Sequence, residues 1–97
     1  MTKPINWNSD KNLELISSRS ISFEEVVFYL DNNGLIDDKP HPNTDKYPKQ
    51  RVFVVLIDDY VYLVPYVEND SEIFLKTIIP SRKATKQYLE VIKNEKN

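Results

Sequence analysis

Two apolar runs on either side of a pair of aspartates constrain the fold of this chain more than any other feature. Residues 51–57 and 60–66 are rich in β-branched and aromatic side chains, and only Asp58-Asp59 separates them. This pattern is typical of a β-hairpin with a two-residue turn, although the usual turn glycine is absent. We therefore predict two long antiparallel strands.

This pairing divides the hairpin side chains between two faces. If Arg51 faces Tyr66, one face is aliphatic, and we expect the helices to cover it. The other face carries an arginine among aromatic rings, and RNA bases could stack there, above all on Tyr62 and Tyr66. The alternative is that the tyrosines merely pack well in strands and keep their hydroxyls wet. The two faces consist of Val52, Val54, Leu56, Val61 and Leu63 and of Arg51, Phe53, Val55, Tyr60, Tyr62, Val64 and Tyr66.

A third strand leads directly into a C-terminal helix. Residues 73–79 form an apolar run, Pro80 cannot donate to a ladder, and Ser81 is a favourable helix N-cap. We predict an antiparallel meander of three strands, a helix over about residues 82–92, and a frayed tail at residues 93–97. The side chains expected to be buried by this helix are Ala84, Tyr88, Val91 and Ile92.

Cations gather where this strand becomes a helix. Arg82, Lys83 and Lys86 lie in the first turn of the predicted helix, where the helix dipole disfavours positive charge. We expect Lys76 on the face of Arg51, because the aliphatic face would bury an unpaired ammonium. A cluster that opposes the dipole predicts that an anion binds here.

Charge and composition limit the classes of function. The chain has 97 residues, enough for one domain, and a net charge of −2, but residues 1–72 carry −6 and residues 73–97 carry +4. A phosphate contact must therefore be local to the basic end; the alternative is that the basic helix only pairs with acids of the body. With no cysteine, one histidine and no run long enough to span a bilayer, we expect no metal site, no cofactor and a cytoplasmic location.

Two helices are predicted before the hairpin. Residues 5–7 read as a short strand, and residues 8–10 can cap a brief helix over residues 11–17, with Leu13 and Ile16 inward. The second helix begins with a capping box, Ser22 with Glu25. Asn33-Gly34 then supplies a left-handed C-cap, and residues 35–37 form a short strand. The inward face of the second helix consists of Phe23, Val26, Val27 and Leu30.

A long proline-rich loop is predicted over residues 38–50, just before the hairpin. It holds His41, the only histidine, and Tyr47, and either group could act as an acid or base near a phosphate. The alternative is that a histidine between two prolines in a surface loop is only solvated.

Several strings in this order resemble the BrnT family of type II toxins, which belongs to the RelE/ParE-like superfamily. They are Trp7 with Lys11-Asn12, residues 21–25 (Ile-Ser-Phe-Glu-Glu), and residues 81–85 (Ser-Arg-Lys-Ala-Thr) after the last strand. The likeness covers nearly the whole chain. One departure is Ser18-Arg19-Ser20, where members of the family often have lysine-histidine-glycine.

This resemblance implies a small α+β domain of RelE type, spanning residues 1–97. Its antiparallel sheet would carry N-terminal helices and a C-terminal helix. The implied activity is cleavage of messenger RNA, neutralised by a cognate antitoxin protein. The alternatives are a ParE-like gyrase poison and a binding module without catalysis, which would dock an acidic partner or hold RNA uncut.

We hypothesise a metal-independent cleavage in which the ribose 2′-hydroxyl attacks its own phosphate and leaves a 2′,3′-cyclic phosphate. Cations would stabilise the charge on the phosphoryl oxygens, and His41 or Tyr88 would carry the proton. The candidate catalytic residues are Arg82, Lys83, Arg51, Lys76, His41 and Tyr88. The candidate substrate-binding residues are Tyr62, Tyr66 and Lys86.

Overall fold

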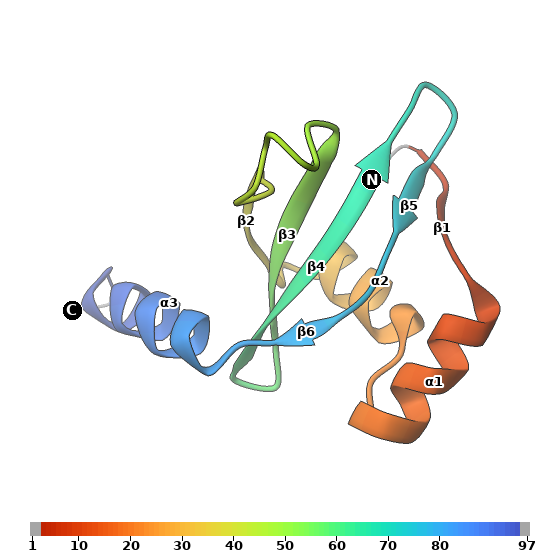
Figure 1. Cartoon of the computed structure of the whole chain (residues 1–97). Helices are drawn as coiled ribbons and strands as arrows, with labels where there is room; N and C mark the ends of the chain where they lie inside the picture. Colours follow the sequence, from red (N-terminus) through yellow and green to blue (C-terminus); the bar gives the residue numbers. More distant parts are fainter. Residues whose placement is uncertain (1–2, 96–97) are drawn as a thin grey trace.

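The predicted hairpin is the centre of a six-stranded sheet in the computed structural model, which describes residues 3–95 and the side chains of residues 3–91 (Figure 1). Within this part of the chain, three helices and six strands form an α+β fold. The elements in chain order are β1 (Ile5–Trp7), α1 (Ser9–Arg19), α2 (Phe23–Asp31), β2 (Leu35–Pro40), β3 (Gln50–Ile57), β4 (Tyr60–Glu68), β5 (Ile73–Leu75), β6 (Ile79–Pro80) and α3 (Arg82–Glu95).

The register of the hairpin agrees with the prediction. Strands β3 and β4 pair with Arg51 opposite Tyr66. Asp58 and Asp59 form the turn with positive φ angles of 51° and 64°. Two successive positive φ angles match the right-handed twist of the strands, which is why a hairpin turn of this type forms even without glycine.

The three-strand antiparallel meander is confirmed, but the sheet as a whole is mixed and not antiparallel as predicted. The strands lie in the order β1-β5-β4-β3-β2, with β6 also paired to β4. Strand β1 runs parallel to β5, whereas the remaining pairs are antiparallel. The chain leaves β1 through two helices and reaches the opposite edge of the sheet before it returns, so no tight turn imposes an antiparallel direction.

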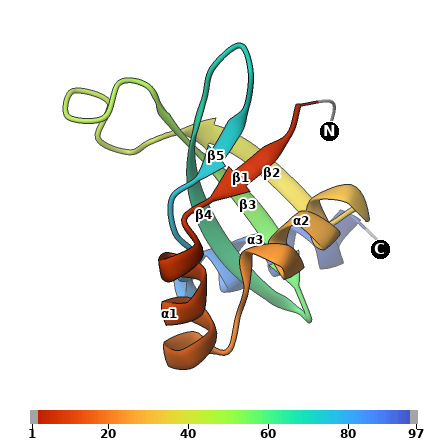
Figure 2. The ribbon, with the colours of Figure 1, turned by 90° about the vertical axis from the view of Figure 1, so that its right-hand side faces the viewer.

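The helices cover the two faces of the sheet differently from the prediction. Helices α1 and α2 pack on the aromatic face, where Phe53 and Tyr66 are 2% and 1% exposed and their rings stack at 3.8 Å between centroids. Figure 1 shows α3 apart from these helices, and in Figure 2 it passes behind the strands while α1 and α2 lie in front; it packs on the aliphatic face through Ala84. The expectation that the helices leave the aromatic face open is therefore wrong: Phe53 and Tyr66 are buried beneath two helices, whereas Tyr60 and Tyr62, nearer the hairpin turn, stay half-exposed.

Helix α3 begins as predicted but ends later. The Ser81 hydroxyl accepts a hydrogen bond from the Ala84 amide at 3.1 Å, which confirms the N-cap. The helix continues through Glu95, so residues 93–95 are not a tail; residues 96–97 and the predicted burial of Ile92 lie outside what the structure describes. Val91 is 50% exposed, contrary to the prediction.

The predicted third strand is interrupted by a β-bulge. Leu75 pairs with Tyr66 and Ile79 pairs with Leu63, so residues 76–78 oppose only two residues of β4. The extra residue reverses which side chains face the helices, as bulges do. Leu75 therefore faces α1 and α2, whereas Ile79 faces the other side of the sheet.

The bulge is attached to α1 by an arginine. Ile78 is fully buried, and its carbonyl oxygen accepts a hydrogen bond from Arg19 Nη1. Arg19 therefore supports the sheet from α1.

Helix α1 has the predicted N-cap but a different inner face. The Asn8 side chain accepts from the Lys11 amide at 2.9 Å. Leu13 and Ile16 are 65% and 45% exposed, so the prediction that they point inward is wrong. Instead Asn12 is buried, because its side chain accepts from the Phe23 amide at the start of α2.

Helix α2 begins and ends close to the predicted residues. The Ser22 hydroxyl accepts from the Glu25 amide at 3.1 Å, which confirms the N-cap. At the other end Asn33, and not Gly34, is left-handed, with φ of 67°. Gly34 is needed for space, since a Cβ there would lie 2.7 Å from both Cβ and the carbonyl oxygen of Tyr29.

Candidate functional site

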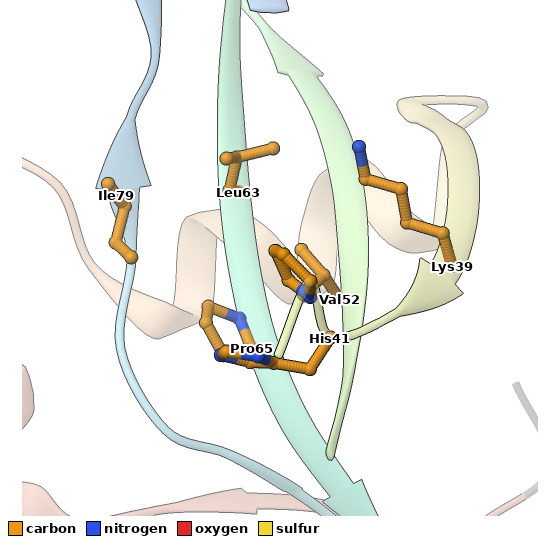
Figure 3. A pocket seen from close by; sticks show the side chains of 7 residues that line it. Lys39, His41, Val52, Leu63, Pro65 and Ile79 are labelled. Atoms are coloured by element: carbon orange, nitrogen blue, oxygen red, sulfur yellow. The ribbon is translucent and has the colours of Figure 1, made fainter. Parts of the chain in front are cut away.

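A small pocket lies on the part of the aliphatic sheet face that α3 leaves uncovered (Figure 3). It has a volume of about 140 Å³, which is below the range of roughly 300–1,000 Å³ for sites of drug-sized ligands. It therefore suits one side chain or one base. Its lining comes from strands β2, β3, β4 and β6 and from the loop that follows β2. The lining residues are Lys39, His41, Pro42, Val52, Leu63, Pro65 and Ile79.

His41 reaches this pocket because the pairing of β2 with β3 continues one residue past the strand. The His41 amide donates to the carbonyl oxygen of Gln50 at 3.1 Å, and its ring lies 4.6 Å from that of Tyr47. The Asn43 amide donates to His41 Nδ1 at 3.0 Å. The neutral ring therefore carries its proton on Nε2, which makes that nitrogen a hydrogen-bond donor.

Lys39 and Tyr88 extend the site toward α3. Lys39 pairs with Val52, and its Nζ lies 6.0 Å from the centre of the Tyr88 ring. The Tyr88 hydroxyl donates to Asp37 Oδ2 at 3.1 Å. Partial burial and then this hydrogen bond raise the pKa of Tyr88, so the hydroxyl remains protonated at neutral pH.

Lys39 is the site residue that the sequence analysis missed. We predicted a loop from residue 38 onward, whereas β2 continues to Pro40. Alternation along the longer strand places Asp37 and Lys39 on the aliphatic face and Asp38 on the other. The residues of β2 do not alternate between apolar and polar, so no signal in the sequence pointed to the longer strand.

Lys76 lies on the face of the pocket and not on the face of Arg51. Its amide donates to the carbonyl oxygen of Pro65 at 2.8 Å, and its ammonium lies 5.6 Å from the centre of the Phe74 ring. The predicted face is wrong, because β5 pairs with β4 in the other register. The ammonium nevertheless stays exposed, since α3 does not reach this part of the sheet.

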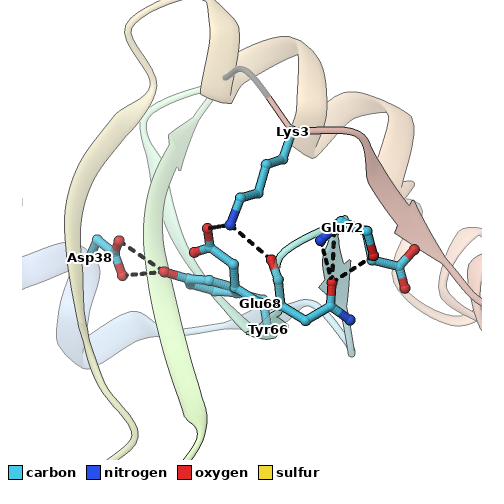
Figure 4. A network of polar contacts seen from close by, with 7 residues as sticks. Lys3, Asp38, Tyr66, Glu68 and Glu72 are labelled. Atoms are coloured by element: carbon cyan, nitrogen blue, oxygen red, sulfur yellow. Dashed lines mark hydrogen bonds and ion pairs between the residues drawn. The ribbon is translucent and has the colours of Figure 1, made fainter.

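Arg51 is held in a cluster on the opposite face. Its Nε lies 3.1 Å from Asp38 Oδ1, and the Tyr66 hydroxyl donates to both oxygens of the same carboxylate (Figure 4). Burial is the main cause that raises the pKa of Tyr66 to about 12. The cluster links three neighbouring strands, and it does not face the pocket.

The remaining predicted site residues lie elsewhere. Arg82, Lys83 and Lys86 are exposed near the start of α3. The structure does not bring them together with Arg51, because Pro80 pairs near one end of β4 and Arg51 near the other. Tyr62 is half-buried on the face of α1 and α2, and Tyr66 is buried there.

Within residues 3–95, no group of three or more His, Asp or Glu side chains is arranged to hold a metal ion. The same residues include no helix of the length and apolarity that crossing a bilayer requires.

Comparison of the chain with models of protein families, with curated proteins and with solved structures finds no match. The resemblance to BrnT toxins therefore depends on the strings of residues quoted above.

Proposed function

We propose that this chain is a cytoplasmic toxin of BrnT and RelE type that cleaves RNA and is neutralised by a cognate antitoxin. The observation that supports this function best is that Lys39 and His41 line one pocket on an exposed sheet face, with the Tyr88 ring beside Lys39. Lys39 and His41 offer a cation and a hydrogen-bond donor beside an apolar floor. The resemblance of the sequence to BrnT toxins supports the same function.

In the proposed reaction the 2′-oxygen bonds to phosphorus and the bond from phosphorus to the 5′-oxygen breaks. The proton lost by the 2′-hydroxyl and the proton gained by the 5′-oxygen exchange with water. Lys39 stabilises the charge on the phosphoryl oxygens, His41 Nε2 donates a hydrogen bond to one of them, and the exposed Lys76 on the same sheet face binds a neighbouring phosphate. Arg82, Lys83 and Lys86 bind phosphates further along the strand.

Incubation of the purified chain with labelled RNA in EDTA tests this proposal. We expect cleavage that leaves a 2′,3′-cyclic phosphate and falls roughly 10²-fold in Lys39→Ala or His41→Ala. Arg82→Ala should weaken RNA binding more than it slows the bound reaction, and Arg51→Ala should cleave at the parental rate when folded. No cleavage by the folded parent would refute the nuclease.

A second candidate function is binding without catalysis, and the floor of the pocket favours it. Val52, Leu63 and Pro65 provide aliphatic surface and no aromatic ring on which a base could stack. Such a floor suits an apolar side chain of a protein such as the antitoxin. An uncut RNA in EDTA together with a stable complex with the antitoxin would favour this function, and inhibition of DNA gyrase would favour a ParE-like poison.

A further inference from the structure

A second exposed surface lies on the other side of the sheet, where α2 approaches the turn between β3 and β4. Phe28 is 59% exposed, and its ring meets the ring of Tyr29 edge-on at 5.3 Å between centroids. The Tyr29 hydroxyl donates to Asp58 Oδ1 at 3.2 Å. We call this surface the aromatic–acidic patch; it consists of Glu25, Phe28, Tyr29, Asp58, Tyr60 and Tyr62.

The start of β4 provides the other half of the patch. The rings of Tyr60 and Tyr62 lie 5.5 Å apart, and both side chains are half-exposed. The hydrogen bond to Asp58 is the main cause that raises the pKa of Tyr29, and the charge of Glu25 adds to it. The pKa of Tyr62 is also raised, mainly by partial burial, and the charges of Glu25 and Asp58 contribute to this shift. Both carboxylates therefore act on the same group of rings.

No cation of the described chain neutralises these two carboxylates. The ion pairs of Lys3 with Glu68, Lys11 with Glu14 and Arg51 with Asp38, all between described side chains, include neither carboxylate. Among the described side chains, the partner of Glu25 is the Ser22 hydroxyl and the partner of Asp58 is the Tyr29 hydroxyl, and each carboxylate accepts one hydrogen bond. Negative charge and exposed ring surface thus remain available side by side.

We infer that the aromatic–acidic patch binds an arginine-containing segment of a partner protein. A guanidinium can stack on a tyrosine or phenylalanine ring while it pairs with a carboxylate, whereas an ammonium acts as a point charge. Tyrosine is also among the residues that dominate the binding energy of protein interfaces. The carboxylates repel phosphate, so this surface is distinct from any surface that binds RNA.

Titration of the isotope-labelled full chain with two peptides tests this inference by NMR. The probes are acetyl-Gly-Arg-Gly-Arg-Gly-amide and its counterpart with lysine in place of arginine, at physiological salt. We expect amide shifts centred on Glu25, Phe28 and Asp58, and binding of the arginine peptide that is tighter by roughly threefold or more. Shifts spread evenly over the acidic surface, or equal binding of both peptides, would overturn the inference.

Variants separate the patch from general negative charge. The double variant Glu25→Gln with Asp58→Asn should lower the affinity for the arginine peptide about fivefold. The control Asp45→Asn with Asp70→Asn removes the same charge elsewhere and should change this affinity less than about twofold. Phe28→Ala should fold, because the ring is mostly exposed, and should weaken binding about threefold. Two results contradict a protein segment as the occupant: patch shifts on dilution without peptide, which indicate self-association, and patch shifts with a single-stranded RNA.

Discussion

The Tyr66 hydroxyl donates to both carboxylate oxygens of Asp38, at 2.8 and 2.9 Å, although Tyr66 itself is only 1% exposed. The bond joins β4 to β2 across β3, and Arg51 of β3 pairs with the same carboxylate. A buried ring thus holds the edge strand that carries Lys39. The cluster stabilises the frame of the candidate site from the opposite face of the sheet.

Replacement of Tyr66 by phenylalanine should destabilise the fold by about 1–2 kcal/mol, because Asp38 loses a charge-assisted hydrogen bond. The free energy of unfolding in urea would measure this. Tyr60→Phe is a matched control, since the structure gives its hydroxyl no hydrogen bond to the described residues, and it should change stability by less than about 0.5 kcal/mol. Equal effects of the two substitutions would contradict the role of the cluster.

The same tyrosine should make the fold sensitive to alkali. Burial raises the pKa of Tyr66 to about 12 in the folded chain, whereas the unfolded chain releases this proton near its ordinary value of about 10. Folding therefore gains its full contribution from Tyr66 below pH 10 and loses it as the pH rises toward 12. Between pH 10 and pH 12 the unfolding free energy of the parent should therefore fall by about 2–3 kcal/mol more than that of Tyr66→Phe. Parallel curves of unfolding free energy against pH would contradict this.

The turn of the hairpin offers a way to stabilise the chain. Asp59 has φ of 64°, a conformation in which glycine avoids the steric cost of a Cβ. Asp59→Gly should stabilise the fold by about 0.5–1 kcal/mol, with a higher midpoint of thermal unfolding. Asp70→Gly, in a loop whose residues have no positive φ, serves as the control and should not stabilise. A lower midpoint for Asp59→Gly would mean that the aspartate makes a stabilising contact of its own.

Substitution of the only glycine should have the opposite effect. A Cβ on Gly34 would lie 2.7 Å from the carbonyl oxygen of Tyr29, and backbone cannot move aside as a flexible side chain can. Gly34→Ala should therefore cost about 1–3 kcal/mol. Asn33→Gly, at the neighbouring residue with positive φ, should be neutral or stabilising. Thermal unfolding of both variants would show whether space or conformation limits this turn.

The sequence predicted local structure well because local rules decide it. The caps at Asn8, Ser22 and Ser81 and the hairpin register follow from short strings, and the structure confirms them. Which face each helix covers is not local. Both faces of the hairpin are apolar enough to be buried, so alternation alone could not show that α1 and α2 choose the aromatic face.

The candidate site was harder to predict, for two physical reasons. The bulge before Ile79 shifts the pairing of the third strand, and no residue type within residues 73–79 indicates that an extra residue is inserted there. The face assigned to Lys76 depended on its pairing with β4, and there the favoured register was the wrong one. Arg51 was predicted to meet a phosphate, yet Asp38 pairs with it from a strand that was expected to have ended.

Arg19 allows a test that separates support of the fold from chemistry. Its contact with the carbonyl of buried Ile78 should make Arg19→Ala less stable by about 1–2 kcal/mol, while Arg19→Lys should recover part of this loss. Because this contact lies on the α1 side of the sheet and the pocket on the other, RNA cleavage per folded molecule should stay at the parental level. Urea unfolding and RNA cleavage in EDTA, measured on the same preparations, would show whether Arg19 supports the fold or takes part in cleavage. A stable Arg19→Ala that no longer cleaves RNA would instead place Arg19 in the reaction.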